Sequence, residues 1–109
     1  MKHWKRSLTR LKQNKIFSLL GLAARSRNVV SGEFSTEKAV KEGKAKLVLV
    51  AEDASDNTKK LFSNKCSYYR VPIYFVGTKD VLGHAMGKES RASLAITDPG
   101  FAKAMMEQL

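Results

Sequence analysis

The sequence contains little of what disulfide-bonded, zinc-binding or membrane proteins need. Cys66 is the only cysteine in 109 residues, which excludes an intramolecular disulfide and a cysteine-based zinc site. We expect Cys66 to be a small buried or half-buried hydrophobe in a reducing compartment. No apolar run approaches the ~18 residues of a membrane-spanning helix, and the basic N-terminus lacks the apolar core of a signal peptide. These features predict a cytoplasmic protein without a membrane partner.

Motifs of the common catalytic and cofactor-binding sites are also missing. There is no Gly-x-x-x-x-Gly-Lys phosphate loop, no Gly-x-Gly-x-x-Gly after a strand, and no nucleophile elbow. His3 and His84 are far apart in sequence and lack the spacing of metal ligands. Glu52 and Asp53 are adjacent carboxylates, but acids before a helix are expected capping residues. We therefore expect a binding protein rather than an enzyme, with no catalytic residue, cofactor or metal.

Acidic residues are absent from the first 32 positions. These positions carry eight basic residues, which are Lys2, Lys5, Arg6, Arg10, Lys12, Lys15, Arg25 and Arg27. The other 77 residues carry twelve basic and ten acidic residues, so most of the net charge of +10 is N-terminal. Such a concentrated basic surface attracts polyanions, and nucleic acid is the leading candidate. A soluble protein with a charged tail is the alternative that charge alone leaves open.

The sequence does contain enough apolar residues for one folded domain. Hydrophobic residues make up 43% of the chain, and its length suits a single core. We expect residues 1–12 to form a basic N-terminal extension, either a loose tail or the first turns of an amphipathic helix. Trp4 in this extension either packs on the body or stacks on a base. Residues 13–109 are expected to form a single α/β domain that binds nucleic acid.

Helical and strand patterns alternate along this domain. We expect helices over residues 14–24, 35–42 and 56–64, around 81–85 and after 99, and strands over 29–30, 46–51, 71–76 and 93–97. The expected helix N-caps are Asn14, Ser35 or Thr36, Asp53 or Ser55, and Asp98. The alternation predicts an α/β fold with helices on both faces of a small central mixed sheet.

The stretch from Ser31 to Asp53 is the most informative part of the chain. Gly32 is expected to open a loop that leads into a helix, and Gly43 stands where a C′ glycine would end that helix. A strand buried on both faces is expected to follow. A helix N-terminus points backbone N–H groups and a positive dipole outward, and lysines flank this one. The stretch therefore predicts a nucleic-acid surface.

Short motifs occur together over residues 14–109. They are Gly32, Lys38-Ala39-Val40, Gly43, Ala45-Lys46-Leu47-Val48, Ala51-Glu52-Asp53, Val71-Pro72-Ile73-Tyr74, Leu82-Gly83, Ala92-Ser93 and Asp98-Pro99-Gly100. In this combination the chain resembles the kink-turn-binding ribosomal protein family, in particular its small bacterial YlxQ-like branch. The resemblance implies a three-layer α/β/α sandwich. It also implies binding of kinked RNA with tandem sheared G·A pairs, through the loop and helix start after the glycine.

The resemblance also implies roles for individual residues. Lys38 matches a lysine that contacts RNA in the family, and Phe34 and Ser35 stand where an Asn-Glu pair reads guanine edges. Phe34 either stacks on an exposed base or turns into the core. Residues 87–91 resemble the second contact loop of the family, and their polar character predicts phosphate contact. The expected RNA-binding residues are Arg25, Arg27, Gly32, Glu33, Phe34, Ser35, Lys38, Lys41, Lys88, Ser90 and Arg91.

We therefore expect a monomeric protein that binds structured RNA, either kink-turn-like or ribosome-associated. Two alternatives belong to other classes. One is a protein-interaction module of the translation machinery, and the other is an RNA-recognition partner of a separate RNA-modifying enzyme. The concentration of basic residues in the first 32 positions favours RNA, because a surface that binds protein does not need it.

Overall fold

A four-stranded mixed sheet forms the middle layer of the protein, for which a computed structural model describes residues 10–109. Within the sheet the strand order is β1-β4-β2-β3, and only β2 and β3 are paired in parallel. The strands are β1 (Val29–Ser31), β2 (Leu47–Val50), β3 (Ile73–Phe75) and β4 (Ser93–Ile96). The two central strands, β2 and β4, are buried along their whole length, which explains why all their residues except Ser93 are apolar.

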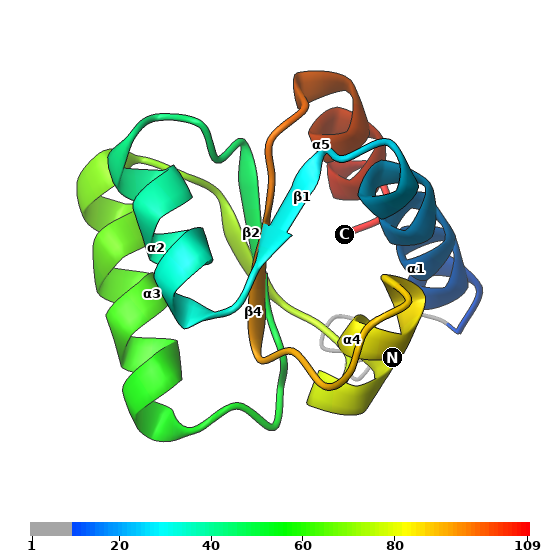
Figure 1. The fold of residues 1–109 in the computed structure, drawn as a ribbon, viewed down its shortest axis with the longest axis horizontal. Coiled ribbons are helices and arrows are strands. Elements are labelled where there is room, and N and C mark those ends of the chain that lie inside the picture. The colour runs from blue at the N-terminus through cyan, green and yellow to red at the C-terminus, as the bar shows by residue number, and fades with distance from the viewer. Residues whose placement is uncertain (1–9) are drawn as a thin grey trace, which may run out of the picture.

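Helices cover both faces of the sheet (Figure 1). The helices are α1 (Arg10–Arg25), α2 (Glu33–Lys41), α3 (Asp56–Tyr69), α4 (Lys79–Ala85) and α5 (Pro99–Met106). Helices α2 and α3 pack together on one face, while α1 packs against α4 and α5 on the other. This arrangement confirms the predicted α/β/α sandwich with a small central mixed sheet. Across residues 10–109, no helix has the length and hydropathy that a bilayer crossing requires.

The core is built from one apolar face of each helix and from the two central strands. Ile16 and Leu20 of α1, Phe62 of α3, Leu82 of α4 and Met105 of α5 are fully buried. Each of these side chains contributes about 1.5–3 kcal/mol of burial free energy relative to an exposed position. Ile16 and Leu20 lie four residues apart, the helical spacing that places two side chains on the same buried face of α1.

Three helix starts agree with local capping chemistry. The Ser55 hydroxyl accepts a hydrogen bond from the Thr58 N–H, so Ser55 rather than Asp53 caps α3. The Asp98 carboxylate accepts one from the Phe101 N–H at 2.8 Å, with a proline at the first helical position as predicted. The Thr78 hydroxyl caps α4 in the same way. Asp53 instead accepts a hydrogen bond from the Lys79 N–H and fastens the start of α4.

Two other predicted helix starts are wrong. Helix α1 already includes Arg10, so Asn14 lies inside the helix and is not its N-cap. Helix α2 begins at Glu33 with Gly32 as its N-cap, which places Ser35 and Thr36 inside the helix. The reason is that β1 extends to Ser31 and delivers the chain directly to α2. The predictions for Trp4 and His3 lie outside the described residues.

The ends of several elements differ from the predicted ranges. Helix α3 continues to Tyr69, five residues beyond the predicted end, because nothing in its sequence breaks the helix before Arg70. Arg70 ends it in the left-handed conformation, with φ 61°. Gly43, with φ 75°, follows α2 as the predicted C′ glycine. Strands β2, β3 and β4 are each shorter than predicted by one to three residues, as sequence patterns locate element ends poorly.

Cys66 provides a test of the core. Its side chain is 1% exposed, and burial raises the pKa of the thiol to about 11. At pH 8 this pKa leaves about a hundredfold less thiolate than in the unfolded chain, so a thiol reagent should label native protein at least that much more slowly. Labelling with a chromogenic disulfide, with and without denaturant, measures the ratio. Equal rates in both conditions would contradict a buried Cys66.

Candidate nucleic-acid interface

The junction between β1 and α2 is built around Gly32. Its N–H donates to the Ser93 carbonyl of β4, and its carbonyl accepts from the Thr36 N–H, each at 3.0 Å. The glycine has φ 91° and ψ 159°, a conformation that an L side chain rarely adopts. Among the described residues, no side chain caps α2. The first N–H groups of this helix are therefore available to an external acceptor, unlike those of the side-chain-capped helices.

The loop from α4 to β4 lies beside this junction. The Arg91 Nε donates a hydrogen bond to the Ser31 Oγ at 3.0 Å, although the two residues are 60 positions apart. Other guanidinium donors reach the carbonyls of Ser90 at 3.0 Å and Glu89 at 3.4 Å. Figure 1 shows β1 entering α2 at the same end of the sheet where the chain leaves α4 for β4. Arg91 therefore fastens the two predicted contact loops to each other.

A close contact with Gly83 fixes the α4–β4 loop against its own helix. The Lys88 N–H donates to the Gly83 carbonyl at 2.8 Å. A Cβ at position 83 would lie 1.9 Å from the Glu89 carbonyl oxygen, a distance at which the loop backbone must move. Glycine is required here by the close approach of the loop and not by its own backbone angles. The loop conformation thus depends on one small residue outside it.

Three of the predicted basic residues line one groove beside β1. This edge groove has a volume of about 280 Å³ and contains the side chains of Arg25, Arg27 and Lys88. Ala24, Val29, Ser31 and Met86 complete its lining. Within the described sheet β1 pairs only with β4, so the groove follows a free strand edge from the α1 end to the α4–β4 loop. Arg27 occupies the left-handed region, with φ 63°.

A second group of predicted residues lies on the outer face of α2. Phe34, Lys38 and Lys41 follow one another at helical spacing and line a shallow groove of about 190 Å³ with Glu37 and Glu42. The Phe34 side chain is 78% exposed, so it does not turn into the core. Lys41 Nζ lies 3.3 Å from a Glu37 oxygen, whereas Lys38 projects into solvent. Lys38 is accordingly better placed than Lys41 to meet a phosphate.

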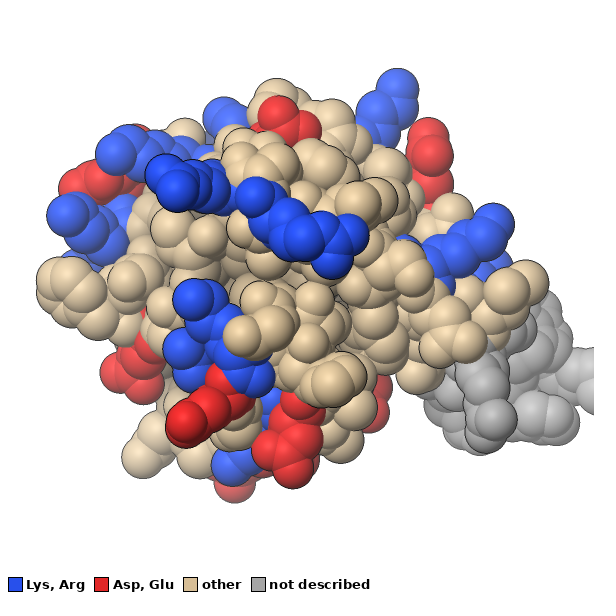
Figure 2. Space-filling model, turned by 45° about the vertical axis from the view of Figure 1, so that its right-hand side comes forward, with Lys and Arg blue, Asp and Glu red and all other residues tan. Residues whose placement is uncertain are grey.

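The predicted residues therefore form two patches that meet at Gly32. Arg25, Arg27 and Lys88 lie on the edge-groove side, and Phe34, Lys38 and Lys41 lie on the α2 side. Glu33, Ser35 and Ser90 are exposed around the same junction, and Arg91 is half-buried at its centre. Figure 2 shows Lys and Arg side chains following one another across the middle of one face, with Asp and Glu mostly around its margin. Such a distribution suits a polyanion.

Sequence reasoning missed Ser31 and the two buried hydroxyls behind the junction. Ser31 holds Arg91, and no local pattern pairs residues so far apart in the chain. Thr36 and Ser93 are the buried side-chain hydroxyls without a hydrogen-bond partner in the part of the chain that the structure describes. Both belong to the residues that bond the Gly32 backbone. Unsatisfied buried groups are uncommon, and here they lie directly behind the candidate interface.

The interface offers hydrogen bonds and charge rather than metal chemistry. Over residues 10–109, no group of three or more His, Cys, Asp or Glu side chains is placed to hold a metal ion. What the surface does present is a set of helix N–H groups, an exposed aromatic ring and several cations. These groups suit the phosphates, base edges and base faces of a nucleic acid.

Two curated relatives of the chain are named for RNA binding. An RNA-binding protein YlxQ from Bacillus subtilis is 50% identical over 93 residues, covering 85% of this chain and 93% of that protein. An RNA-binding protein YlxQ from Enterococcus faecium is 40% identical over 95 residues, covering 87% and 91%. The names of these relatives and of the matching family describe RNA-binding proteins and a ribosomal protein family.

Solved structures show the same fold. A protein of unknown function from Bacillus halodurans has a TM-score of 0.84 at 40% identity and covers 86% of this chain and 95% of its own. A 15.5kD RNA binding protein from Giardia lamblia has a TM-score of 0.79 at 22% identity, covering 99% and 92%. The sequence matches the ribosomal protein L7Ae/L30e/S12e/Gadd45 family over residues 14–106. The chain is therefore a YlxQ-like member of the L7Ae/L30e/S12e/Gadd45 family.

Proposed function

We propose that this protein binds a kinked, structured RNA at the β1–α2 junction and the adjoining α4–β4 loop. The observation that carries the proposal is the Arg91–Ser31 hydrogen bond, because it joins two surface segments into one site. The names of its YlxQ relatives support RNA as the class of partner. Both kink-turn-like RNA and ribosome-associated RNA fit this surface.

The uncapped start of α2 supplies the central contact. Its free N–H groups and dipole favour a phosphate or a carbonyl edge of a base. Glu33, in the first turn, adds an acceptor for a base amino group. Lys38 neutralises a phosphate one turn further along the helix, while Arg25, Arg27 and Lys88 hold the backbone in the edge groove. The RNA thus bends around the Gly32 junction and contacts both patches.

Phe34 serves as a stacking platform for an unpaired base. An exposed ring costs hydrophobic free energy in the free protein, and a base that stacks on it removes that cost. The family position carries a polar residue, so stacking replaces part of the base-edge recognition that is lost here. Stacking on Phe34 favours a kinked RNA over a regular duplex, because a kink exposes unstacked bases.

The proposal is tested by titrating a short kink-turn RNA and the same RNA with its G·A pairs replaced. At about 0.05 M and about 0.2 M salt we expect both affinities to fall, since each neutralised phosphate releases counterions. The kinked RNA should remain favoured by about tenfold, or about 1.4 kcal/mol, at both salt concentrations. Fluorescence anisotropy of labelled RNA gives both constants.

Phe34 variants provide the matched control for that titration. Phe34→Leu keeps an apolar side chain and should lose most of the preference, whereas Phe34→Tyr keeps a stacking ring and should retain it. The contrary result is that wild type binds the two RNAs with equal affinity and that both affinities fall to the same extent as salt rises. The protein would then bind RNA through its basic surface alone. That result would refute the base-reading role of the Gly32 junction.

Arg91 acts mainly by positioning the two loops. Ser31→Ala removes the acceptor of the Nε hydrogen bond but leaves every cation in place. Arg91→Lys keeps the charge but loses the planar fork of donors. Both variants should lower the affinity for the kinked RNA several-fold without changing the slope of log K against log salt. Arg91→Gln removes the charge and should therefore also lower the magnitude of this slope. An identical loss for kinked and G·A-replaced RNA would show a simple phosphate contact instead.

Gly83→Ala tests whether the loop conformation matters. The new methyl group meets the Glu89 carbonyl and displaces residues 87–91 without touching α2. We expect weaker binding of the kinked RNA and a stability loss of about 1–3 kcal/mol. The exposed neighbour His84 provides the control, since His84→Ala leaves the loop backbone bonds intact. Thermal melts monitored by circular dichroism show whether each variant is folded at the temperature of the binding assay. If Gly83→Ala is folded and binds the kinked RNA with unchanged affinity, the loop is not part of the site.

We also propose that the protein binds RNA as a monomer in the cytoplasm. A free, buried thiol and a surface rich in exposed lysines support this proposal. Light scattering after size exclusion, with and without RNA, measures the stoichiometry.

A further inference from the structure

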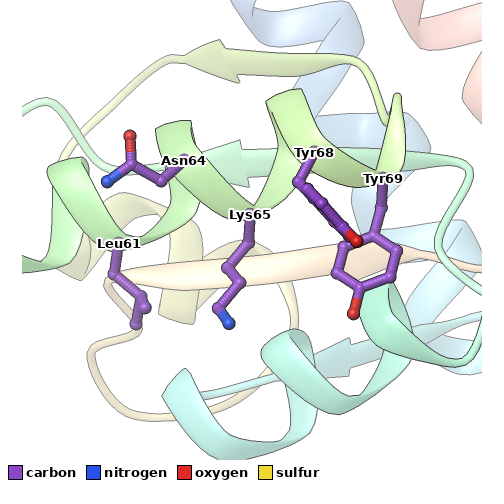
Figure 3. Close-up of a pocket in the computed structure, with 5 residues that line it drawn as sticks. All are labelled: Leu61, Asn64, Lys65, Tyr68 and Tyr69. Atoms are coloured by element: carbon purple, nitrogen blue, oxygen red, sulfur yellow. The ribbon is translucent and has the colours of Figure 1, made fainter.

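Helix α3 carries a groove that the proposed kink-turn site does not use. The groove has a volume of about 590 Å³ and is lined by Leu61, Asn64, Lys65, Tyr68 and Tyr69 (Figure 3). Figure 3 shows the two tyrosine rings side by side at one end, with Lys65 and Leu61 projecting from the same side of the helix. This α3 groove is larger than either groove at the Gly32 junction.

The two tyrosines form a preorganised aromatic pair on the surface. Their ring centroids lie 4.8 Å apart with planes at 77°, an edge-to-face contact. Despite this contact, Tyr68 is 79% exposed and Tyr69 is 40% exposed. The contact restricts the rings while leaving faces open to solvent. A base that stacks on Tyr68 therefore loses little additional side-chain entropy on the protein side.

Basic residues outnumber acidic ones over α2, α3 and the turns that follow these helices, taken together. Residues 36–46 and 57–72, which include most of α2 and α3, carry eight basic and two acidic residues. The basic residues are Lys38, Lys41, Lys44, Lys46, Lys59, Lys60, Lys65 and Arg70. Outside these two segments, the chain from residue 33 onward carries four basic and eight acidic residues. The positive excess of this part of the chain therefore lies on the helical layer that holds the α3 groove.

A shared ion pair connects the α3 groove with the outer face of α2. One Glu37 carboxylate oxygen lies 3.3 Å from Lys41 Nζ and 3.6 Å from Lys65 Nζ, so one anion bridges two cations. The bridge places Lys65 beside α2 and keeps an unneutralised positive charge between the two grooves.

Arg70, the residue that follows Tyr69 in the sequence, has an unusual backbone conformation for an arginine. It ends α3 with φ 61° and ψ 45°, where glycine or asparagine is the common residue. Its N–H donates to the Cys66 carbonyl, so the backbone forms a normal helix end in spite of the arginine side chain. The exposed guanidinium follows directly after Tyr69. Cations interleaved with exposed aromatic rings are typical of surfaces that bind single-stranded nucleic acid.

We propose that the α3 groove is a second RNA site, which takes a single-stranded segment by stacking a base on Tyr68. The inference rests on the proposed function in that RNA is the partner. It adds a site that reads no sequence and that holds an unpaired extension of the structured RNA. Lys65 and Arg70 contact the phosphates on either side of the stacked base. Charge complementarity favours RNA over a protein partner for this surface.

The test measures binding of a fluorescein-labelled uridine oligomer of about ten nucleotides, which has no kink. Tyr68→Ala should lower affinity for the oligomer about tenfold, because one stacking interaction is lost. Tyr68→Phe keeps the ring and should stay within about twofold of the wild-type affinity. Tyr74 is 38% exposed and lies on β3 outside the groove lining, so Tyr74→Ala is the matched control and should bind like wild type.

The same variants are then titrated with a compact kink-turn RNA, with and without a single-stranded extension. Tyr68→Ala should bind the compact RNA as wild type does and should lose the affinity gained from the extension. If Tyr68→Ala and wild type bind the oligomer equally, the groove is not an RNA site and the proposal is wrong. A different result would separate the two proposals. If the protein shows no preference for kink-turn RNA but Tyr68→Ala still lowers affinity for the oligomer, the proposed function is wrong and the α3 groove remains an RNA site.

Discussion

The antiparallel pairing of β2 with β4 is the constraint on which the rest of the structure depends. Leu47 is paired with Ile96 and Val50 with Ser93, and every residue of both strands is buried. Because both faces of this pair are apolar, helices must cover both sides of the sheet. The outer strands β1 and β3 are then added at the edges of an already buried centre. A one-residue slip in this pairing would turn the apolar side chains to the wrong faces.

The candidate interface follows from the same register. Pairing of β1 with β4 places Ser31 opposite Leu94, and the Gly32 N–H bonds the next β4 carbonyl, that of Ser93. The chain enters β4 from the α4 loop at this point, so the two contact loops meet without any further element. The Arg91–Ser31 hydrogen bond fixes a proximity that strand pairing has already created. The proximity of the two loops is thus a consequence of strand order.

The sequence predicted the order, type and inward faces of the elements, because these depend on local periodicity and capping residues. It predicted that a helix starts just after Gly32 for the same reason, since a glycine before an amphipathic segment is a local signal. It assigned the α2 cap wrongly, because Ser35 and Thr36 are good capping residues while the actual start is set by pairing of β1 with β4. Non-local contacts such as Arg91 with Ser31, or Gly83 with Glu89, have no signature in the sequence.

The same reasoning explains why the charge of the first 32 residues gave an incomplete view of the basic surface. The remaining chain has a small net charge, but folding separates its basic and acidic residues. Residues 36–46 and 57–72 become neighbours as α2 and α3 pack together, so their lysines and Arg70 combine on one layer. Most acidic residues of this part of the chain lie in other segments. Net charge along a sequence therefore underestimates the field that a polyanion meets, because packing brings cations from separate segments onto one face.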